Sequence, residues 1–140
     1  MSYQEKKVVS CFLFSQGNVL IVKRSEKVGS YRGRWAGISG YIEDGELEQA
    51  YKEIEEETGL RSEEVDLLGR GKPLKVADKK IGIQWVIYPF LFSVKNIKKI
   101  KIDWEHVESR WIHPDQMRYY NTVPHLYEAF LNALKSRKKN

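Results

Sequence analysis

Three glutamates of the chain are spaced so that a helix would place them together. Glu53, Glu56 and Glu57 stand at positions i, i+3 and i+4, and helical geometry brings such residues onto one face with Cβ atoms about 5–6 Å apart. Carboxylate oxygens on a rigid helix are ligands that hard divalent cations such as Mg²⁺ or Mn²⁺ prefer. A solvated acidic face is the alternative, because like-charge pairs on an exposed helix cost only about 0.2–0.5 kcal/mol each.

A helix from Glu46 to Thr58 is predicted to carry these carboxylates, and Gly59 supplies its natural stop. The positions that would face a core are spaced four, three and four residues apart, as on one side of a helix that packs on a sheet: Leu47, Tyr51, Ile54 and Thr58. Because Glu53 directly precedes Ile54, the carboxylates lie beside the buried stripe and not opposite it. Such a position can line a cleft.

Strand-like segments flank this helix on both sides. A hairpin is expected from residues 7–14 and 18–23, joined by the turn Gln16-Gly17-Asn18. Further strands are expected over residues 35–42, 65–68, 83–94 and 108–112, with a helical turn over 114–117 and a final helix after Pro124. Pro89 suggests that its strand lies at a sheet edge or carries a bulge. The pattern predicts one domain over residues 1–140 of the α/β class (α+β by some conventions), with helices packed on a sheet.

Composition narrows the classes of protein that the chain could represent. Its 140 residues are 41% apolar and 12% aromatic, which is enough for a core in one domain. The longest nearly apolar stretch, Trp85 to Phe92, is too short to cross a bilayer, and no basic start leads into an apolar signal region. Cys11 is the single cysteine, so no intrachain disulfide can form. We therefore expect a cytoplasmic protein without a membrane partner.

Charge is distributed unevenly along the chain. The net charge is +5, which favours anionic partners such as nucleotides or phosphate esters. Against this background, residues 43–57 hold eight acids and one lysine. An acidic segment within a basic protein indicates a specific role for those carboxylates.

A motif from Gly40 to Leu60 joins these observations. The segment reads Gly-Tyr-Ile-Glu-Asp-Gly-Glu-Leu-Glu-Gln-Ala-Tyr-Lys-Glu-Ile-Glu-Glu-Glu-Thr-Gly-Leu. It closely resembles the Nudix box, Gly-x5-Glu-x7-Arg-Glu-U-x-Glu-Glu-x-Gly-U, in which U is an aliphatic residue. Two departures are visible: five residues instead of seven separate Glu46 from the arginine position, and Lys52 occupies that position. Lysine keeps the positive charge but lacks the bidentate fork of arginine.

The resemblance implies a fold, a reaction and a set of site residues. The family has an α/β/α sandwich with a mixed β-sheet and cleaves a diphosphate that is linked to another moiety, with Mg²⁺ or Mn²⁺ as cofactor. Carried over by position, the metal ligands are Glu53, Glu56 and Glu57, with the backbone carbonyl of Gly40 as a further candidate. Glu56 and Glu57 would act most directly in catalysis. Lys52 would be the orienting cation, and we group it with the substrate-binding residues.

The family usually supplies one more glutamate from a distant loop, as ligand or general base. The passage from Asp103 to Trp111 resembles the Glu-His-x-x-x-x-Trp segment of several members, which makes Glu105 the first candidate and Glu108 the second. The alternative for Glu108 is a surface ion pair with Arg110 or a neighbour. We expect His106 to be exposed.

Basic residues before the motif resemble the loop in which family members meet substrate phosphates. Arg24 and Arg34 are the candidates, because a guanidinium grips phosphate oxygens in pairs; plain solvated charge is the alternative. Trp35 could stack on a base, although a place in the core is expected. Trp85, in the middle of a strand, is also expected to be buried.

Three functions from different classes remain open. The leading one is a Mg²⁺-dependent hydrolase of a small nucleoside diphosphate derivative: a nucleoside triphosphate, a sugar nucleotide or a dinucleotide. A non-catalytic module that binds nucleotides or RNA is the alternative, and the clustered carboxylates speak against it. An enzyme like isopentenyl diphosphate isomerase is a weaker alternative, because no cysteine follows Trp35. A homodimer is possible through the C-terminal helix or the strand edge at Pro89.

Overall fold

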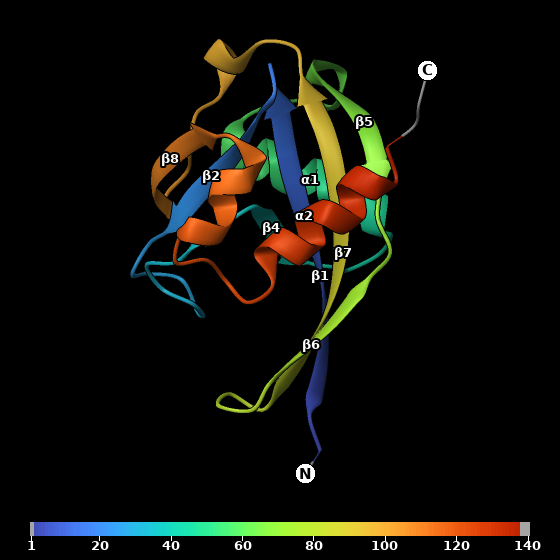
Figure 1. Ribbon diagram of the computed structural model, residues 1–140, viewed down its shortest axis with the longest axis vertical. Coiled ribbons are helices and arrows are strands. Elements are labelled where there is room, and N and C mark those ends of the chain that lie inside the picture. Colours follow the sequence, from blue (N-terminus) through green and yellow to red (C-terminus); the bar gives the residue numbers. More distant parts are fainter. Residues whose placement is uncertain (1, 138–140) are drawn as a thin grey trace.

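The computed structural model describes residues 2–137, which are built around a mixed sheet of eight strands. Strands β1 (Gln4–Ser15) and β7 (Ile83–Val94) run parallel through its centre. Helix α1 (Glu46–Thr58) packs on one face and helix α2 (Leu126–Lys135) on the other, as Figure 1 shows. Three layers result, with the helices outside.

The remaining elements complete the sheet and its connections. The other strands are β2 (Asn18–Arg24), β3 (Trp35–Ala36), β4 (Ile38–Tyr41), β5 (Val65–Arg70), β6 (Leu74–Asp78) and β8 (His106–Ile112). Short 3₁₀ helices span Ser62–Glu64, Ile97–Lys99 and Pro114–Tyr119. Among residues 2–137, no helix is long and apolar enough to cross a membrane.

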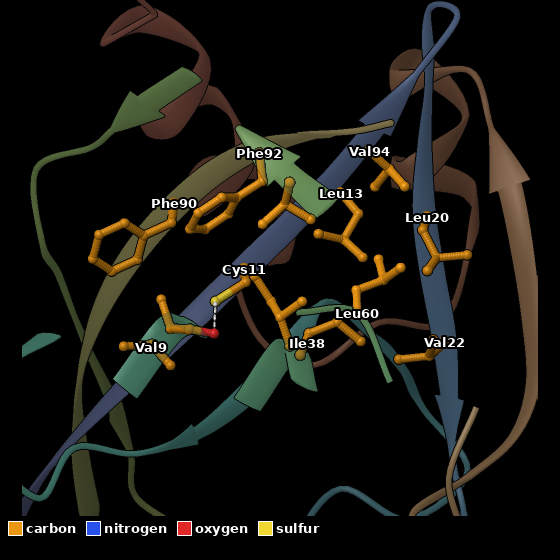
Figure 2. Close-up of a cluster of buried hydrophobic side chains, with 13 residues drawn as sticks. Val9, Cys11, Leu13, Leu20, Val22, Ile38, Leu60, Phe90, Phe92 and Val94 are labelled. Atoms are coloured by element: carbon orange, nitrogen blue, oxygen red, sulfur yellow. Dashed lines mark hydrogen bonds between the residues drawn. The ribbon is translucent and has the colours of Figure 1, made fainter. Parts of the chain in front are cut away.

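Side-chain alternation along β1 divides the interior into two cores. Val9, Cys11 and Leu13 face α1 and belong to the core drawn in Figure 2, where Phe90 and Phe92 of β7 join them. Phe12 points to the opposite face and packs edge-on against Phe130 of α2, with ring centroids 5.4 Å apart.

The predicted hairpin, the central helix and the final helix are confirmed. β1 and β2 pair antiparallel across the turn at Gln16 and Gly17. Helix α1 has the predicted bounds, and Gly59 ends it in the left-handed conformation (φ 78°) with its N–H donating to the carbonyl of Glu55. The helical turn expected near Pro114 is a 3₁₀ helix.

Pro89 was predicted to indicate a sheet edge or a bulge; the edge is wrong, whereas the pairing of β7 with β5 does shift register, between Leu67 and Gly69. β7 lies inside the sheet, with β1 on one side and both β5 and β6 on the other. Pro89 falls where β7 changes partner on that second side: β5 ends opposite Phe90, and β6 begins opposite Ile87. A residue without an N–H therefore stands at a gap in the ladder, where the carbonyl of Pro89 accepts a hydrogen bond from the Gly71 N–H (2.9 Å). This position offers no free edge for a dimer.

A fork between β1 and β2 prepares the site. The two strands pair only next to their turn. Farther along, β1 pairs with β4, whereas β2 pairs with β3 and β8. Gly37 connects β3 to β4 across the fork, where an added Cβ would lie 3.0 Å from the carbonyl oxygen of Cys11. Residues of both diverging strands and of α1, among them Ser10, Arg24 and Glu53, line one cavity.

Candidate functional site

Helix α1 turns two of its three predicted carboxylates toward the sheet. Glu53 is 9% exposed and Glu57 only 1%, whereas Glu56 is exposed. Ala50 and Ile54, which pack in the core beside them, fix the rotation of the helix. The carboxylates thus belong to the inner side of the helix, and Glu57 lies deeper than its place beside the apolar stripe indicates.

Glu57 is the least satisfied polar group of the described chain. Neither carboxylate oxygen accepts a well-formed hydrogen bond from a donor within residues 2–137; the polar groups beside it include the carboxyl group of Glu53 and His106 Nε2, 3.4 Å from Oε1. Burial, followed by a hydrogen bond with Glu53, raises the pKa of Glu57 to about 11. A carboxylate buried without a good donor costs free energy, and a bound cation would offset that cost. These oxygens fit a metal ligand.

Glu53 is held against the backbone of Gly40 and by Gln49. A Cβ at position 40 would overlap the carboxylate of Glu53, so only glycine allows this approach. Gln49 Nε2 donates to Glu53 Oε2 at 2.6 Å. Burial raises the pKa of Glu53, whereas a hydrogen bond with Glu57, and then the one with Gln49, act in the opposite direction. Gln49 was not predicted as a site residue, although its position one helical turn before Glu53 was a usable signal.

The loop before β8 brings Glu105 to the same place. The ligand atoms of Glu57, Glu105 and His106 lie within 4.8 Å of one another. The Ser25 N–H donates to the carbonyl of Glu105 at 2.8 Å and so ties this loop to the end of β2. Burial raises the pKa of Glu105, and the charge of Asp103 adds to the effect.

The expectation that His106 is exposed is wrong. Its side chain is 1% exposed, with Nε2 3.4 Å from Glu57 Oε1 and Nδ1 3.2 Å from Asp103 Oδ1. Burial lowers its pKa, while Asp103 opposes that shift. Asp103 stands three residues before His106, and this spacing could have indicated an imidazole ring whose orientation is fixed by a hydrogen bond to the carboxylate.

Glu108 lies outside this cluster. It is exposed on β8 and accepts from Arg110 Nε at 2.7 Å, which is the surface pair considered above. The described geometry therefore brings Glu105, and not Glu108, to the α1 carboxylates.

The three predicted cations take different positions. Arg24 lines the cavity with its Nε donating to the carbonyl of Ser30 (2.9 Å), and burial lowers its pKa. Lys52 also lines the cavity, but its half-exposed Nζ lies 3.8 Å from Glu43. Arg34 is not among the lining residues; its guanidinium donates to the Thr122 carbonyl at 3.5 Å and lies over the ring of Tyr31.

One cavity of about 570 Å³ joins the carboxylates to an aromatic region. Glu53, Glu56 and Glu105 line one part. Tyr41 of β4 pairs with Val8 of β1, and Trp85 of β7 pairs with Lys6 of β1. Val8 and Lys6 alternate onto the α2 face of the sheet, so the rings of Tyr41 and Trp85 lie on that face too. The cavity therefore extends from the carboxylates on the α1 face of the sheet, past the short strand β4, to the aromatic rings on the α2 face.

Trp85 is buried as expected, yet it also lines the cavity. Its Nε1 donates to the hydroxyl of Tyr31 at 2.9 Å, and that hydroxyl donates to Asp78 at 2.8 Å. The rings of Trp85 and Tyr41 stack with centroids 6.2 Å apart. Trp104, next to Glu105, lines the cavity while 65% exposed. Tyr31, Tyr41 and Trp104 were not predicted as site residues, because no regular spacing along the chain links them. Trp35, by contrast, lies in the α2-side core as expected.

Comparisons with known proteins agree with this architecture. A family model described as NUDIX domain matches residues 5–132. The chain is similar to a NUDIX hydrolase from Nitrosomonas europaea (TM-score 0.76, 15% identity, covering 96% of this chain and 92% of that one). It is also similar to the dihydroneopterin triphosphate pyrophosphohydrolase of E. coli (0.75, 16%, 96% and 99%) and to an Ap4A hydrolase of C. elegans in a binary complex (0.72, 16%, 93% and 98%). These likenesses confirm the predicted α/β/α sandwich with a mixed sheet.

Proposed function

The chain belongs to the NUDIX domain family, and from this premise we propose that it is a Mg²⁺-dependent hydrolase of a nucleoside diphosphate derivative. The observation that supports the proposal is the carboxyl group of Glu57, which accepts no well-formed hydrogen bond from residues 2–137 and is buried beside Glu105, close to the cavity. A module that only binds nucleotides has no use for a buried carboxylate whose cost a cation would offset.

The residues present fit the metal that this family uses. Three side chains offer carboxylate oxygens: Glu53, Glu56 and Glu57. The backbone carbonyl of Gly40 is the further candidate, because the carboxylate of Glu53 packs directly against this glycine. Oxygen ligands of this kind suit Mg²⁺ or Mn²⁺. When bound, such an ion neutralises charge on phosphate oxygens and makes a water molecule more acidic.

The other side chains of the site would bind the substrate and accept a proton. Glu105 faces the α1 carboxylates from another loop, and we assign it the role of general base toward the attacking water. Arg24, whose Nε donates to the Ser30 carbonyl, would bind phosphate oxygens in the same cavity. Lys52, which lines the cavity with a half-exposed side chain, would add positive charge there, and Arg34, which does not line the cavity, would act only through its longer-range charge.

The aromatic part of the cavity favours a nucleoside as the second moiety. Tyr41, Trp85 and Tyr31 offer flat apolar surface within the cavity that also holds the carboxylates. Planar bases stack on such rings for about 1–3 kcal/mol each. A nucleoside triphosphate, a sugar nucleotide or a dinucleotide each carries a base and a diphosphate, and each stays within the proposal. The site of action that we propose is the cytoplasm.

The test is turnover on a panel of nucleotides with Mg²⁺, read as release of phosphate or pyrophosphate. Glu56→Gln should lower the rate about 100-fold or more, because it removes a charged ligand from an exposed position without disturbing the core. Glu55→Gln is the matched control: it removes the same charge from the neighbouring exposed residue, which does not line the cavity. Unchanged turnover in Glu56→Gln would reject the assigned chemistry. Nucleotide binding without turnover on the whole panel would favour the non-catalytic module.

A further inference from the structure

Gln49 links the turn before α1 to a predicted metal ligand. Gln49 is buried, with only 5% of the residue exposed. The amide is used at both ends: Nε2 donates to Glu53 Oε2 at 2.6 Å, and Oε1 accepts from the Glu43 N–H at 3.2 Å. Two different partners fix the orientation of the amide group, since a flipped amide would make neither bond.

Lys52 is engaged elsewhere. Its half-exposed Nζ lies 3.8 Å from Glu43 Oε2, a residue whose own side chain is mostly exposed. A flexible ammonium in such a solvated pair holds no carboxylate in a fixed orientation. The position that carries an arginine in the motif thus leaves Glu53 to another donor.

We propose that Gln49 is the positioning residue that orients Glu53 for metal binding, in place of the cation at position 52. The inference rests on the proposed function, because it assumes that Glu53 is a ligand. The two departures from the motif then have one explanation. The shortened spacing starts α1 directly after Gly45, and one turn later Gln49 meets both the Glu43 N–H and Glu53.

A neutral amide suits this role physically. It restricts the rotamers of Glu53 through a short hydrogen bond, yet it leaves the negative charge that attracts a cation. Gln49 also joins the ligand to the backbone of the preceding turn, which includes Gly45 and leads back to Gly40. Residues that orient metal ligands in this way typically contribute about 10–100-fold to metal affinity.

The experiment measures Mn²⁺ binding by electron paramagnetic resonance, without nucleotide, in the full chain. Gln49→Met keeps the length of the side chain and removes both hydrogen bonds, so we expect the Kd for Mn²⁺ to rise about tenfold or more. The Mg²⁺ concentration for half-maximal turnover should rise in parallel, with kcat at saturating Mg²⁺ changed much less. Gln49→Leu provides the same measurement if the methionine variant does not fold.

Lys52→Met is the matched control, because it introduces the same side chain three residues away. Its Kd for Mn²⁺ should change less than about threefold, since exposed charges interact weakly through solvent. Lys52→Arg added to Gln49→Met should restore much of the lost affinity, because the guanidinium fork can hold a carboxylate bidentately.

The outcomes separate the two proposals. Equal Mn²⁺ affinity in wild type and Gln49→Met overturns the role of Gln49 and leaves the hydrolase proposal intact. A larger loss in Lys52→Met than in Gln49→Met also overturns it. No Mn²⁺ binding by the wild-type protein would instead remove the premise that Glu53 is a ligand.

Discussion

Helices α1 and α2 cover opposite faces of one sheet, yet they bury different side chains. The buried residues of α2 are all apolar: Leu126, Ala129, Phe130 and Ala133. Those of α1 are mostly polar: Gln49, Glu53, Glu57 and Thr58, together with Ala50 and Ile54. Both helices are amphipathic and similar in length, so the difference lies in what each inner face is used for.

The comparison separates stabilisation from function within one fold. Every buried residue of α2 adds apolar contact, as the packing of Phe130 on Phe12 illustrates. On the α1 side, Glu57 is desolvated without accepting a well-formed hydrogen bond from residues 2–137. Such a group lowers stability, and the rest of the core must offset its cost until a cation binds.

The largest effect should come from opening the α2 side. Phe130→Ala removes a fully buried ring, and we expect it to lower the free energy of unfolding by about 3–5 kcal/mol, because contacts are lost and a cavity remains. Urea denaturation measures the change. Leu131→Ala, at a half-buried position of the same helix, should cost clearly less. Equal losses in the two variants would show that the inner face of α2 is not the stabilising one.

On the α1 side, removing a buried carboxyl group should raise the free energy of unfolding instead of lowering it. Glu57→Leu puts an apolar group of similar size in place of a carboxyl that accepts no well-formed hydrogen bond from residues 2–137, so we expect the metal-free protein to gain about 1–2 kcal/mol in free energy of unfolding. Turnover should be lost at the same time, because a predicted ligand is removed. Urea denaturation in the presence of a chelator gives the first quantity, and the nucleotide assay gives the second.

Magnesium sharpens this second prediction. Added Mg²⁺ should raise the melting temperature of the wild-type protein by mass action and leave that of Glu57→Leu nearly unchanged. A loss of stability in Glu57→Leu, in the absence of metal, would contradict the view that function costs stability on this face.

The helical part of this contrast was predictable from the sequence, because both elements have local signals. The 3.6-residue period and Gly59 gave the bounds of α1, and the i, i+3, i+4 spacing placed its carboxylates beside the core. The depth of Glu57 was not predictable, since it depends on β8 and its preceding loop, which arrive about 50 residues later in the chain and place His106 against it.

The aromatic part of the cavity shows why other features were missed. Tyr31, Tyr41 and Trp85 come from a loop and two strands, and only the register of β1 with β4 and β7 gathers them. The edge alternative for Pro89 was wrong for a related reason: its missing N–H is compatible with an edge, while the strand in fact changes partner at that point. Long-range pairing, which local residue preferences do not encode, decides both.

Tyr31, in the aromatic part of the cavity, contrasts with Glu57, because its hydroxyl both accepts a hydrogen bond from Trp85 and donates one to Asp78. Burial, and then the hydrogen bond to Asp78, raise its pKa from 10.0 to about 12. The folded state therefore favours the neutral phenol, and this contribution to stability is present below pH 10 and is lost as the pH rises through 12. Phenolate absorbance at 295 nm, compared between wild type and Tyr31→Phe, should show one tyrosine that ionises late. A difference curve centred near pH 10 would mean that the hydroxyl is free in solution, and that the aromatic end of the cavity is as poorly paired as Glu57.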